Sequence, residues 1–466
     1  MKNSFTGGLK REIALPAAIV LVIANMIGTG VFTSSGFILG EVGSPQALLA
    51  CWVIGGLFAL AGALCYGELG AMLPHAGGEY IYLRRSFGAL PGFVSGWISL
   101  IVGFSAPIAA ASIAFATYLL GGGDEPLFVI DLFDFRLLGI SPVSVLAIAA
   151  IVTFSLVHYH SLHLGQRVQN FLTAFKIAFI LLFVVAGFGL GQGDPSRLAL
   201  LSAGEGDAMP WGDFAVALIF VSFAYSGWNA TAYLGGEIKN PERTLPLALL
   251  IGTAIVTLLY MLLNLLYLYA LPPERMTGLL EVGLGAATAL FGKGIGSFFG
   301  MAIAFGLLSV VSAMIMTGSR VYYAMARDGL FFSTFGQVDA VHHTPAYSIF
   351  FQAAIAIVMV LTAAFEVLLV YIGFTLSLSA MLTVLGLMRL RLKEPDLPRP
   401  YRTFGYPFTP LLFIAGNLWV VVFTISSRPL VGAAGVLTIG IGVALYFLLN
   451  KQSDDSVASC CQAGEL

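Results

Sequence analysis

Two apolar stretches of this 466-residue sequence are interrupted near their middle by residues that suit main-chain binding. The first interruption consists of Met26, Ile27, Gly28, Thr29 and Gly30, and the second consists of Phe223, Ala224, Tyr225, Ser226, Gly227, Trp228 and Asn229. Each stretch is long enough to cross a bilayer, where an unwound backbone must face protein or water. Because the ends of the half-helices carry partial charges of opposite sign, the two breaks predict a site for a small zwitterion.

The first break contains both kinds of main-chain group that a zwitterion needs. Gly28 and Gly30 flank Thr29, so the backbone there can unwind and approach a ligand closely. The amides of Thr29, Gly30 and Val31 would begin the second half-helix, and such an N-terminus binds a carboxylate well. Carbonyls around Met26 would end the first half-helix and suit an ammonium group. An intact helix with a glycine packing notch is the alternative interpretation.

The second break places polar and aromatic side chains inside a predicted span. Asn229 is costly at that depth unless it finds a partner, while Phe223, Tyr225 and Trp228 could pack over a bound side chain. An aromatic packing cluster, with Asn229 bonded to a neighbouring helix, is the alternative. The matching break earlier in the chain favours the binding interpretation.

Lys176 is a single basic residue within another apolar span. A lysine at this depth costs on the order of 3 kcal/mol or more unless it is partnered. Its ammonium could occupy the place of a coupling cation, or it could load and release a proton. Snorkelling of the side chain toward the cytoplasmic interface is the alternative.

The composition of the chain indicates that helices in a membrane must position these residues. The sequence is 58% hydrophobic and 10% charged, whereas a soluble domain carries about 25% charged residues. The apolar stretches are continuous, unlike barrel strands, so the predicted class is an all-α integral membrane protein. At roughly 20 residues per span, about twelve transmembrane helices are predicted, of which the first and sixth are discontinuous. Their predicted limits are residues 13–38, 45–72, 89–120, 142–159, 168–190, 213–236, 245–271, 296–325, 346–364, 366–389, 408–426 and 429–449.

The spacing of the two breaks predicts an inverted repeat. Five predicted spans precede the second break, so a second unit of five would enter the membrane from the opposite side. We expect a single transmembrane domain over residues 1–466. Its repeat A would cover about 13–190, its repeat B about 213–389, and two extra C-terminal helices about 408–449.

The distribution of basic residues predicts the orientation. With a cytoplasmic N-terminus, sixteen of the 22 Lys and Arg residues fall in cytoplasmic loops and five fall outside, while Lys176 lies in a span. Cytoplasmic loops are enriched in Lys and Arg, so we expect both termini in the cytoplasm. The absence of sorting signals favours a bacterial inner membrane.

A group of charged residues is expected at the cytoplasmic ends of several helices. A latch there could be formed by residues 236–246, Glu68, residues 74–80, Arg320, Arg327 and Asp328. The alternative for residues 236–246 is a solvated turn that caps the seventh span, and both could hold. No acidic residue is expected at the depth of either break, which favours a ligand without a cationic side chain.

The sequence shows no residue pattern for metal binding, enzyme catalysis or nucleic-acid binding. The six histidines lack acidic or thiol partners at a metal-ligand spacing, so we expect no metal. No Ser/His/Asp set, P-loop or pair of carboxylates at a common depth is visible, so neither an enzyme nor a cofactor is predicted. No basic cluster suggests nucleic acid.

Four motifs in order carry a family resemblance: Ile27 to Phe32, Phe223 to Asn229, Glu237 to Pro246, and Thr317 to Gly329. Over nearly the whole chain, the sequence resembles the amino acid–polyamine–organocation transporters. It is most similar to the L-type amino acid transporter branch and its bacterial relatives, with the cationic amino acid transporter branch as the near neighbour. The resemblance implies a LeuT-like five-plus-five inverted repeat that works by alternating access.

The resemblance also implies roles for individual residues. The substrate carboxylate would meet Thr29 and Gly30, and its ammonium would meet carbonyls near Met26 and Phe223, with Phe223 as a gate. Lys176 matches the lysine that replaces a sodium ion in sodium-independent members, with Ser312 among its neighbours. The remaining predicted substrate-binding residues are Ile27, Gly28, Ala224, Ser226, Gly227, Trp228 and Asn229.

These observations predict sodium-independent transport of neutral L-amino acids, by exchange or by proton symport. Transport of cationic amino acids or polyamines is the alternative within the superfamily, and an amino-acid-binding membrane sensor or a channel is the alternative of another class. The predicted partners are an amino acid and the lipid bilayer. A single-span accessory subunit, which some relatives have, stays open.

Overall fold

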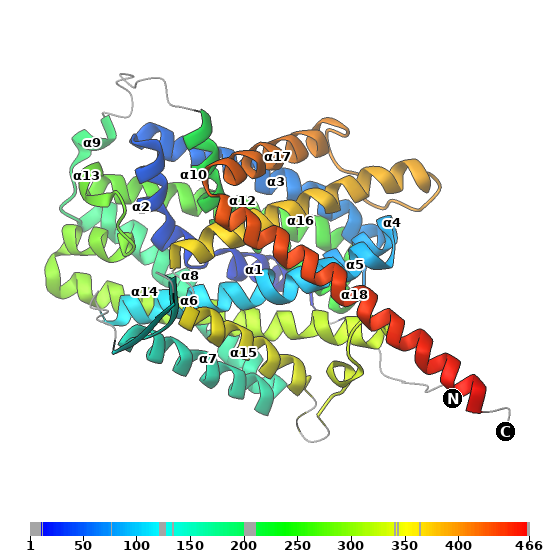
Figure 1. Cartoon of the computed structure of the whole chain (residues 1–466). Coiled ribbons are helices and arrows are strands. Elements are labelled where there is room, and N and C mark those ends of the chain that lie inside the picture. The colour runs from blue at the N-terminus through cyan, green and yellow to red at the C-terminus, as the bar shows by residue number, and fades with distance from the viewer. Residues whose placement is uncertain are drawn as a thin grey trace.

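A computed structural model describes most of the chain and shows a helical protein (Figure 1). The described residues are 11, 13–75, 77–120, 127–132, 135–199, 211–339, 342, 344–362 and 365–463. The terminal residues, whose cytoplasmic location is predicted above, are 1–10 and 464–466 and lie outside these ranges.

Most helices begin and end close to the predicted limits of the spans. Two differ: the helix over residues 282–327 begins before the predicted residue 296 and is kinked at Gly292, and the last helix continues past the predicted residue 449 to residue 463. The first predicted repeat contains α1 (Leu15–Met26), α2 (Gly30–Val42), α3 (Pro45–Met72), α4 (Glu79–Phe87), α5 (Ala89–Ile98), η1 (Ser99–Ser105), α6 (Ala106–Leu120), α7 (Pro142–His160) and α8 (Leu162–Leu190). The chain continues with α9 (Pro195–Ala199), α10 (Trp211–Ala224), α11 (Ala230–Tyr233), η3 (Gly235–Glu237), α12 (Pro241–Ala270), α13 (Pro273–Met276), α14 (Val282–Arg327), η4 (Ser333–Gly336), α15 (Ala346–Thr362), α16 (Phe365–Lys393), α17 (Phe408–Ser427) and α18 (Pro429–Ala463).

The long helices confirm the predicted all-α membrane fold. Within the described residues, nine helices are long and apolar enough to cross a membrane, or ten when the bent pair α1 and α2 is one span. The shorter apolar helices α10 and α15 occupy the places of the sixth and ninth predicted spans. The count of twelve therefore stays a prediction.

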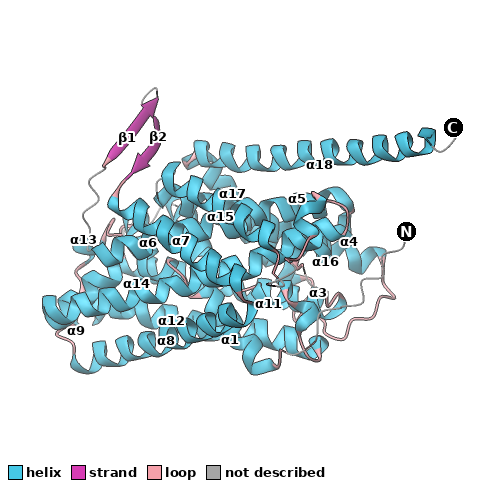
Figure 2. Ribbon diagram, turned by 90° about the horizontal axis from the view of Figure 1, so that it is seen from below, coloured by secondary structure: helices cyan, strands magenta, loops and turns pink. Residues whose placement is uncertain are grey.

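The connection after α6 contains a feature that the sequence analysis did not predict. Strand β1 (Phe128–Leu132) pairs antiparallel with β2 (Phe135–Ile140). This hairpin projects from one end of the helices, and α18 lies along their outer side (Figure 2). The hairpin precedes α7 and takes no part in the site described below.

Local sequence explains where several spans begin. Ser44 and Ser141 each precede a proline at the first helical position, and their side chains accept hydrogen bonds from the amides of Ala47 and Ser144. Ser161 caps α8 in the same manner. Such caps satisfy amides that have no partner within the helix, so they determine the residue at which each of these three spans begins.

Small residues let the central helices approach each other closely. A Cβ on Gly55 of α3 would lie 2.1 Å from Val221 of α10, and one on Gly56 would lie 2.5 Å from Thr257 of α12. Large apolar side chains also point outward, with Val185 and Leu258 exposed by 71% and 62%. Glycine-mediated packing inside and an apolar exterior are what a bundle in lipid requires.

Candidate functional site

The first predicted break is present between α1 and α2, whose axes differ by 44°. The amide of Ile27 donates to Ile23 O at 3.0 Å and closes α1, while the amides of Phe32 and Thr33 donate to Thr29 O at 3.0 and 3.1 Å and open α2. The amides that precede them at the start of α2 are the ones that a helix N-terminus leaves available for an anion. An intact helix with a glycine notch is therefore excluded.

The second predicted break is a turn over residues 225–229 between α10 and α11. The amide of Ser226 donates to Phe223 O at 2.9 Å, and the amide of Ala230 donates to Gly227 O at 3.0 Å. Gly227 has a φ of +90°, a region that only glycine adopts without strain. The glycine therefore allows the helix to unwind at this point of the span.

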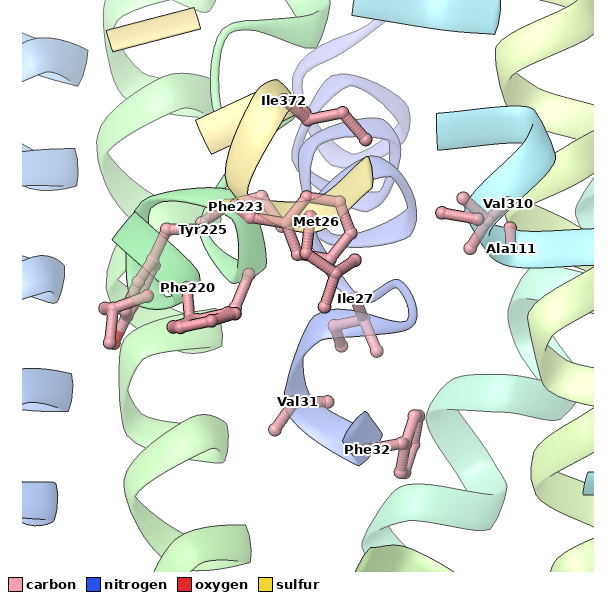
Figure 3. Close-up of a cluster of buried hydrophobic side chains, with 14 of the residues drawn as sticks. Met26, Ile27, Val31, Phe32, Ala111, Phe220, Phe223, Tyr225, Val310 and Ile372 are labelled. Carbon is pink, nitrogen blue, oxygen red and sulfur yellow. The ribbon is translucent and has the colours of Figure 1, made fainter. Parts of the chain in front are cut away.

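The two breaks lie directly against each other. A Cβ on Gly30 would lie 2.3 Å from the Cα of Ala224, and a Cβ on Gly227 would lie 2.7 Å from Asn25 O. Figure 3 shows Met26 and Ile27 around the first break, with Phe223 of α10 beside them. Two segments separated by about half of the chain thus form one locus through their backbones.

Tyr260 of α12 joins the two breaks. Its hydroxyl lies 2.5 Å from Met26 O and 2.9 Å from Ala224 O, which are the last carbonyls of α1 and α10. A hydroxyl has one proton, so the two carbonyls share it. Tyr260 was not predicted from the sequence, although a tyrosine inside a span needs a polar partner and could have indicated it.

A cavity of about 90 Å³ adjoins the second break. Ser226, Gly227, Trp228 and Asn229, all predicted to bind substrate, line it together with Tyr225 and with Asn25 of α1. Met26, Ile27, Thr29, Phe223 and Ala224 are buried in the core next to these residues. Gly28 is half-buried near Val310, and Gly30 packs on Ala224 as described.

Lys176 of α8 reaches the end of α1. Its side chain is 1% exposed, and Nζ donates to Ala24 O at 2.8 Å and to Ile27 O at 2.5 Å. These carbonyls belong to the last turn and the break of the first span. Snorkelling is therefore excluded, and the ammonium stabilises the negative end of the helix dipole.

Ser312 of α14 is fully buried, and its Oγ lies 2.9 Å from His158 Nε2 of α7. The ammonium of Lys176 donates to main-chain carbonyls at the end of α1, whereas Ser312 was expected among its neighbours. Within the described residues, no group of three or more His, Cys, Asp or Glu residues could hold a metal ion.

Glu79, at the start of α4, reaches the cavity although no acidic residue was expected near either break. Its Oε1 accepts hydrogen bonds from Tyr66 Oη at 2.7 Å and Asn229 Nδ2 at 2.9 Å, and its Oε2 accepts one from Ser379 Oγ at 2.7 Å. That expectation was wrong because the loop before α4 folds back against the second break. Desolvation raises the pKa of Glu79, which lies between two spans, although the three donors oppose the shift.

Predicted cytoplasmic charges also pair between distant helices. Arg320 Nε lies 3.7 Å from Glu237 Oε1, and Arg84 forms an ion pair with Asp328. Tyr80 Oη donates to the same Asp328 carboxylate at 2.6 Å. The predicted pairing of the end of α14 with the loops after the second and sixth spans is confirmed for Arg320 and Asp328. Glu68, which was expected to take part, pairs with Arg391 and Arg399 instead.

Comparison with known proteins gives a family match over almost the entire chain. The family model described as "Amino acid permease" matches residues 13–456. It therefore includes both breaks, Lys176 and the Glu79 loop.

Individual relatives extend over similar lengths. The large neutral amino acids transporter small subunit 2 of Mus musculus is 31% identical over 443 residues, which are 94% of this chain and 81% of that protein. The serine/threonine exchanger SteT of Bacillus subtilis is 31% identical over 454 residues, 96% of this chain and 98% of its own. The b(0,+)-type amino acid transporter 1 of Mus musculus is 31% identical over 431 residues, with 91% and 84% covered.

Proposed function

This chain belongs to the amino acid permease family, and we propose that it moves neutral L-amino acids across a membrane by alternating access without sodium. The predicted resemblance to amino acid–polyamine–organocation transporters is confirmed by this membership, as is the prediction of a transporter rather than an enzyme. The names of two relatives, a large neutral amino acids transporter subunit and a serine/threonine exchanger, support a neutral substrate.

The contact between the two helix breaks is the observation on which the proposal rests. The start of α2 would bind the substrate carboxylate through the amides of Thr29 and Gly30, and the end of α1 near Met26 would bind the ammonium. Since every α-amino acid carries these two groups, main-chain recognition leaves the side chain to the cavity. The cavity residues that would contact the side chain include Ser226 and Trp228.

Lys176 supports independence from sodium. Its ammonium occupies carbonyls at the first break that a coupling cation would otherwise need. Tyr260 holds Met26 O in this arrangement, so the substrate ammonium would displace the hydroxyl from that carbonyl. The hydroxyl can then remain on Ala224 O, 2.9 Å away.

The proposed topology places two inverted units around the breaks. Repeat A would cover about 13–190 and repeat B about 213–389, followed by two extra helices. The start of α1 is paired with the start of α12, because Ile13 N donates to Glu237 O at 3.0 Å and Lys239 N donates to Ile13 O at 2.8 Å. This supports a common side for both starts, which we propose is the cytoplasm of a bacterial cell, with both termini on that side.

Uptake by the purified protein in liposomes tests the proposal. Labelled serine, alanine and leucine would be offered with and without internal amino acid, in sodium and in choline buffers. We expect saturable uptake that choline supports as well as sodium does. Uptake that requires sodium would refute the lysine-for-sodium argument, and non-saturable flux would indicate a channel.

A further inference from the structure

Glu79 is a buried carboxylate without a positively charged partner among the described residues. It is 4% exposed and lines the cavity at the second break. The three groups that donate to it are neutral, namely the Tyr66 hydroxyl, the Asn229 amide and the Ser379 hydroxyl. Burying an ionised carboxylate without a counter-charge is strongly unfavourable, even when it is hydrogen-bonded.

Glu68, a second buried carboxylate near the end of α3, differs from Glu79 in having arginine partners. Its oxygens accept from Arg391 Nε at 2.8 Å and Nη2 at 2.6 Å, and from the amide and hydroxyl of Thr403 at 2.7 Å each. Arg399 Nε lies 3.6 Å away. Among the described residues, guanidinium groups thus contact one buried glutamate and none contacts the other.

The side chains that surround Glu79 are neutral. The titratable side chains that face it are the phenols of Tyr66 on α3, Tyr82 on α4 and Tyr233 on α11. Helix α16 contributes the hydroxyl of Ser379. None of these groups carries a positive charge, so neutralisation of Glu79 requires a cation from the cavity.

The hydrogen-bond geometry is compatible with both protonation states. As a carboxylate, Glu79 accepts all three hydrogen bonds. As a carboxylic acid, it can donate from Oε2 to Ser379 Oγ across the same 2.7 Å, because a serine hydroxyl can rotate and accept. One buried water needs about 10–15 Å³, so the cavity of about 90 Å³ has room for waters that deliver the proton.

We propose that Glu79 is a proton-binding site that couples amino acid movement to proton movement. This inference rests on the proposed transport function. A proton from cavity water forms an O–H bond with the Glu79 carboxylate on one side of the membrane, and the same bond breaks when the proton leaves to water on the other side. The neutral form can be enclosed when the cavity closes, whereas the ionised form resists enclosure.

Asn229 is the residue that transmits the state of Glu79 to the substrate site. It lies in the second break and donates to Glu79 Oε1 at 2.9 Å. Protonation weakens this charge-assisted hydrogen bond, since a neutral carboxyl group is the poorer acceptor. The break that would contact the substrate is therefore sensitive to whether the proton is bound.

The test measures protons and amino acid together in liposomes that contain a trapped pH-sensitive dye. Adding a neutral L-amino acid outside should acidify the interior of liposomes with the wild-type protein. Uptake should increase as external pH falls, with a limit of about tenfold per pH unit for one titrating group. Glu79→Gln should abolish the acidification per amino acid taken up and flatten the pH profile, while Glu79→Asp should restore both.

Glu41→Gln is the matched control, because Glu41 is paired with Arg428 at 2.8 Å and does not line this cavity. It should keep the proton-to-amino-acid ratio of the wild type. Uptake by the wild type without acidification would overturn the inference, as would an unchanged ratio in Glu79→Gln. Selective loss of lysine or putrescine uptake in Glu79→Gln would overturn it too, by assigning the carboxylate to a cationic substrate. Absence of any amino acid uptake by the wild type would refute the proposed function instead.

Discussion

Gly30→Ala should separate the two helix breaks, and its effect can be worked out from the structure. The added Cβ would lie 2.3 Å from the Cα and 2.5 Å from the Cβ of Ala224. The Cα belongs to the backbone of α10, so no flexible side chain can move away to make room. Overpacking of this kind costs about 1–3 kcal/mol, and relieving it moves α2 away from α10.

Gly40→Ala is the matched control within the same helix α2. Its Cβ would meet only Thr277 Cγ2 at 3.6 Å, which is an ordinary contact. Replacing a glycine inside a helix gains up to about 1 kcal/mol in helix propensity. Gly40→Ala should therefore melt at the wild-type temperature or above it.

The assay combines thermal denaturation in detergent with amino acid uptake in liposomes. Gly30→Ala should melt below the wild type and lose most of its uptake, whereas Gly40→Ala should keep both. If Gly30→Ala transported and melted like the wild type, the direct contact between the breaks would have no importance for function.

Two further substitutions test buried charges. Lys176→Met keeps the aliphatic stem but leaves the carbonyls of Ala24 and Ile27 without their donor, which costs about 1.5–3 kcal/mol for each charge-assisted bond. Uptake should be lost in both sodium and choline buffers. A wild-type rate of uptake would contradict the proposed role of Lys176. Glu68→Gln leaves Arg391 and Arg399 without their carboxylate and should destabilise the protein by about 3–5 kcal/mol. An unchanged melting temperature would show that this network does not stabilise the C-terminal end of α3.

The spans and breaks could be predicted because each depends on local sequence. Long apolar stretches set α3 and α12, and glycines next to polar residues marked both breaks at Gly28 and Gly227. The hairpin at residues 128–140 was missed, because its strands are short and resemble a loop in a single sequence.

The contacts inside the site depend on tertiary structure and could not be predicted from sequence. Tyr260 lies in a span whose rotation about its axis is set only by packing, so its position between Met26 and Ala224 was not visible. Glu79 lies in a segment that reads as a loop, and its return to Asn229 connects residues 150 positions apart. Lys176 could be identified from the sequence because a charge within an apolar span is exceptional. The carbonyl groups that it contacts could not be identified in this way.

The claim that the two breaks bind the charged ends of an amino acid is tested most directly by ligand binding to the purified protein. Affinities would be measured for L-alanine, for its amide, which lacks the carboxylate, and for propionate, which lacks the ammonium. Each loss removes hydrogen bonds to a charged group worth about 1.5–3 kcal/mol, so both analogues should bind at least about tenfold more weakly. An amide or a propionate that bound as tightly as L-alanine would contradict recognition by the main chain of the two breaks.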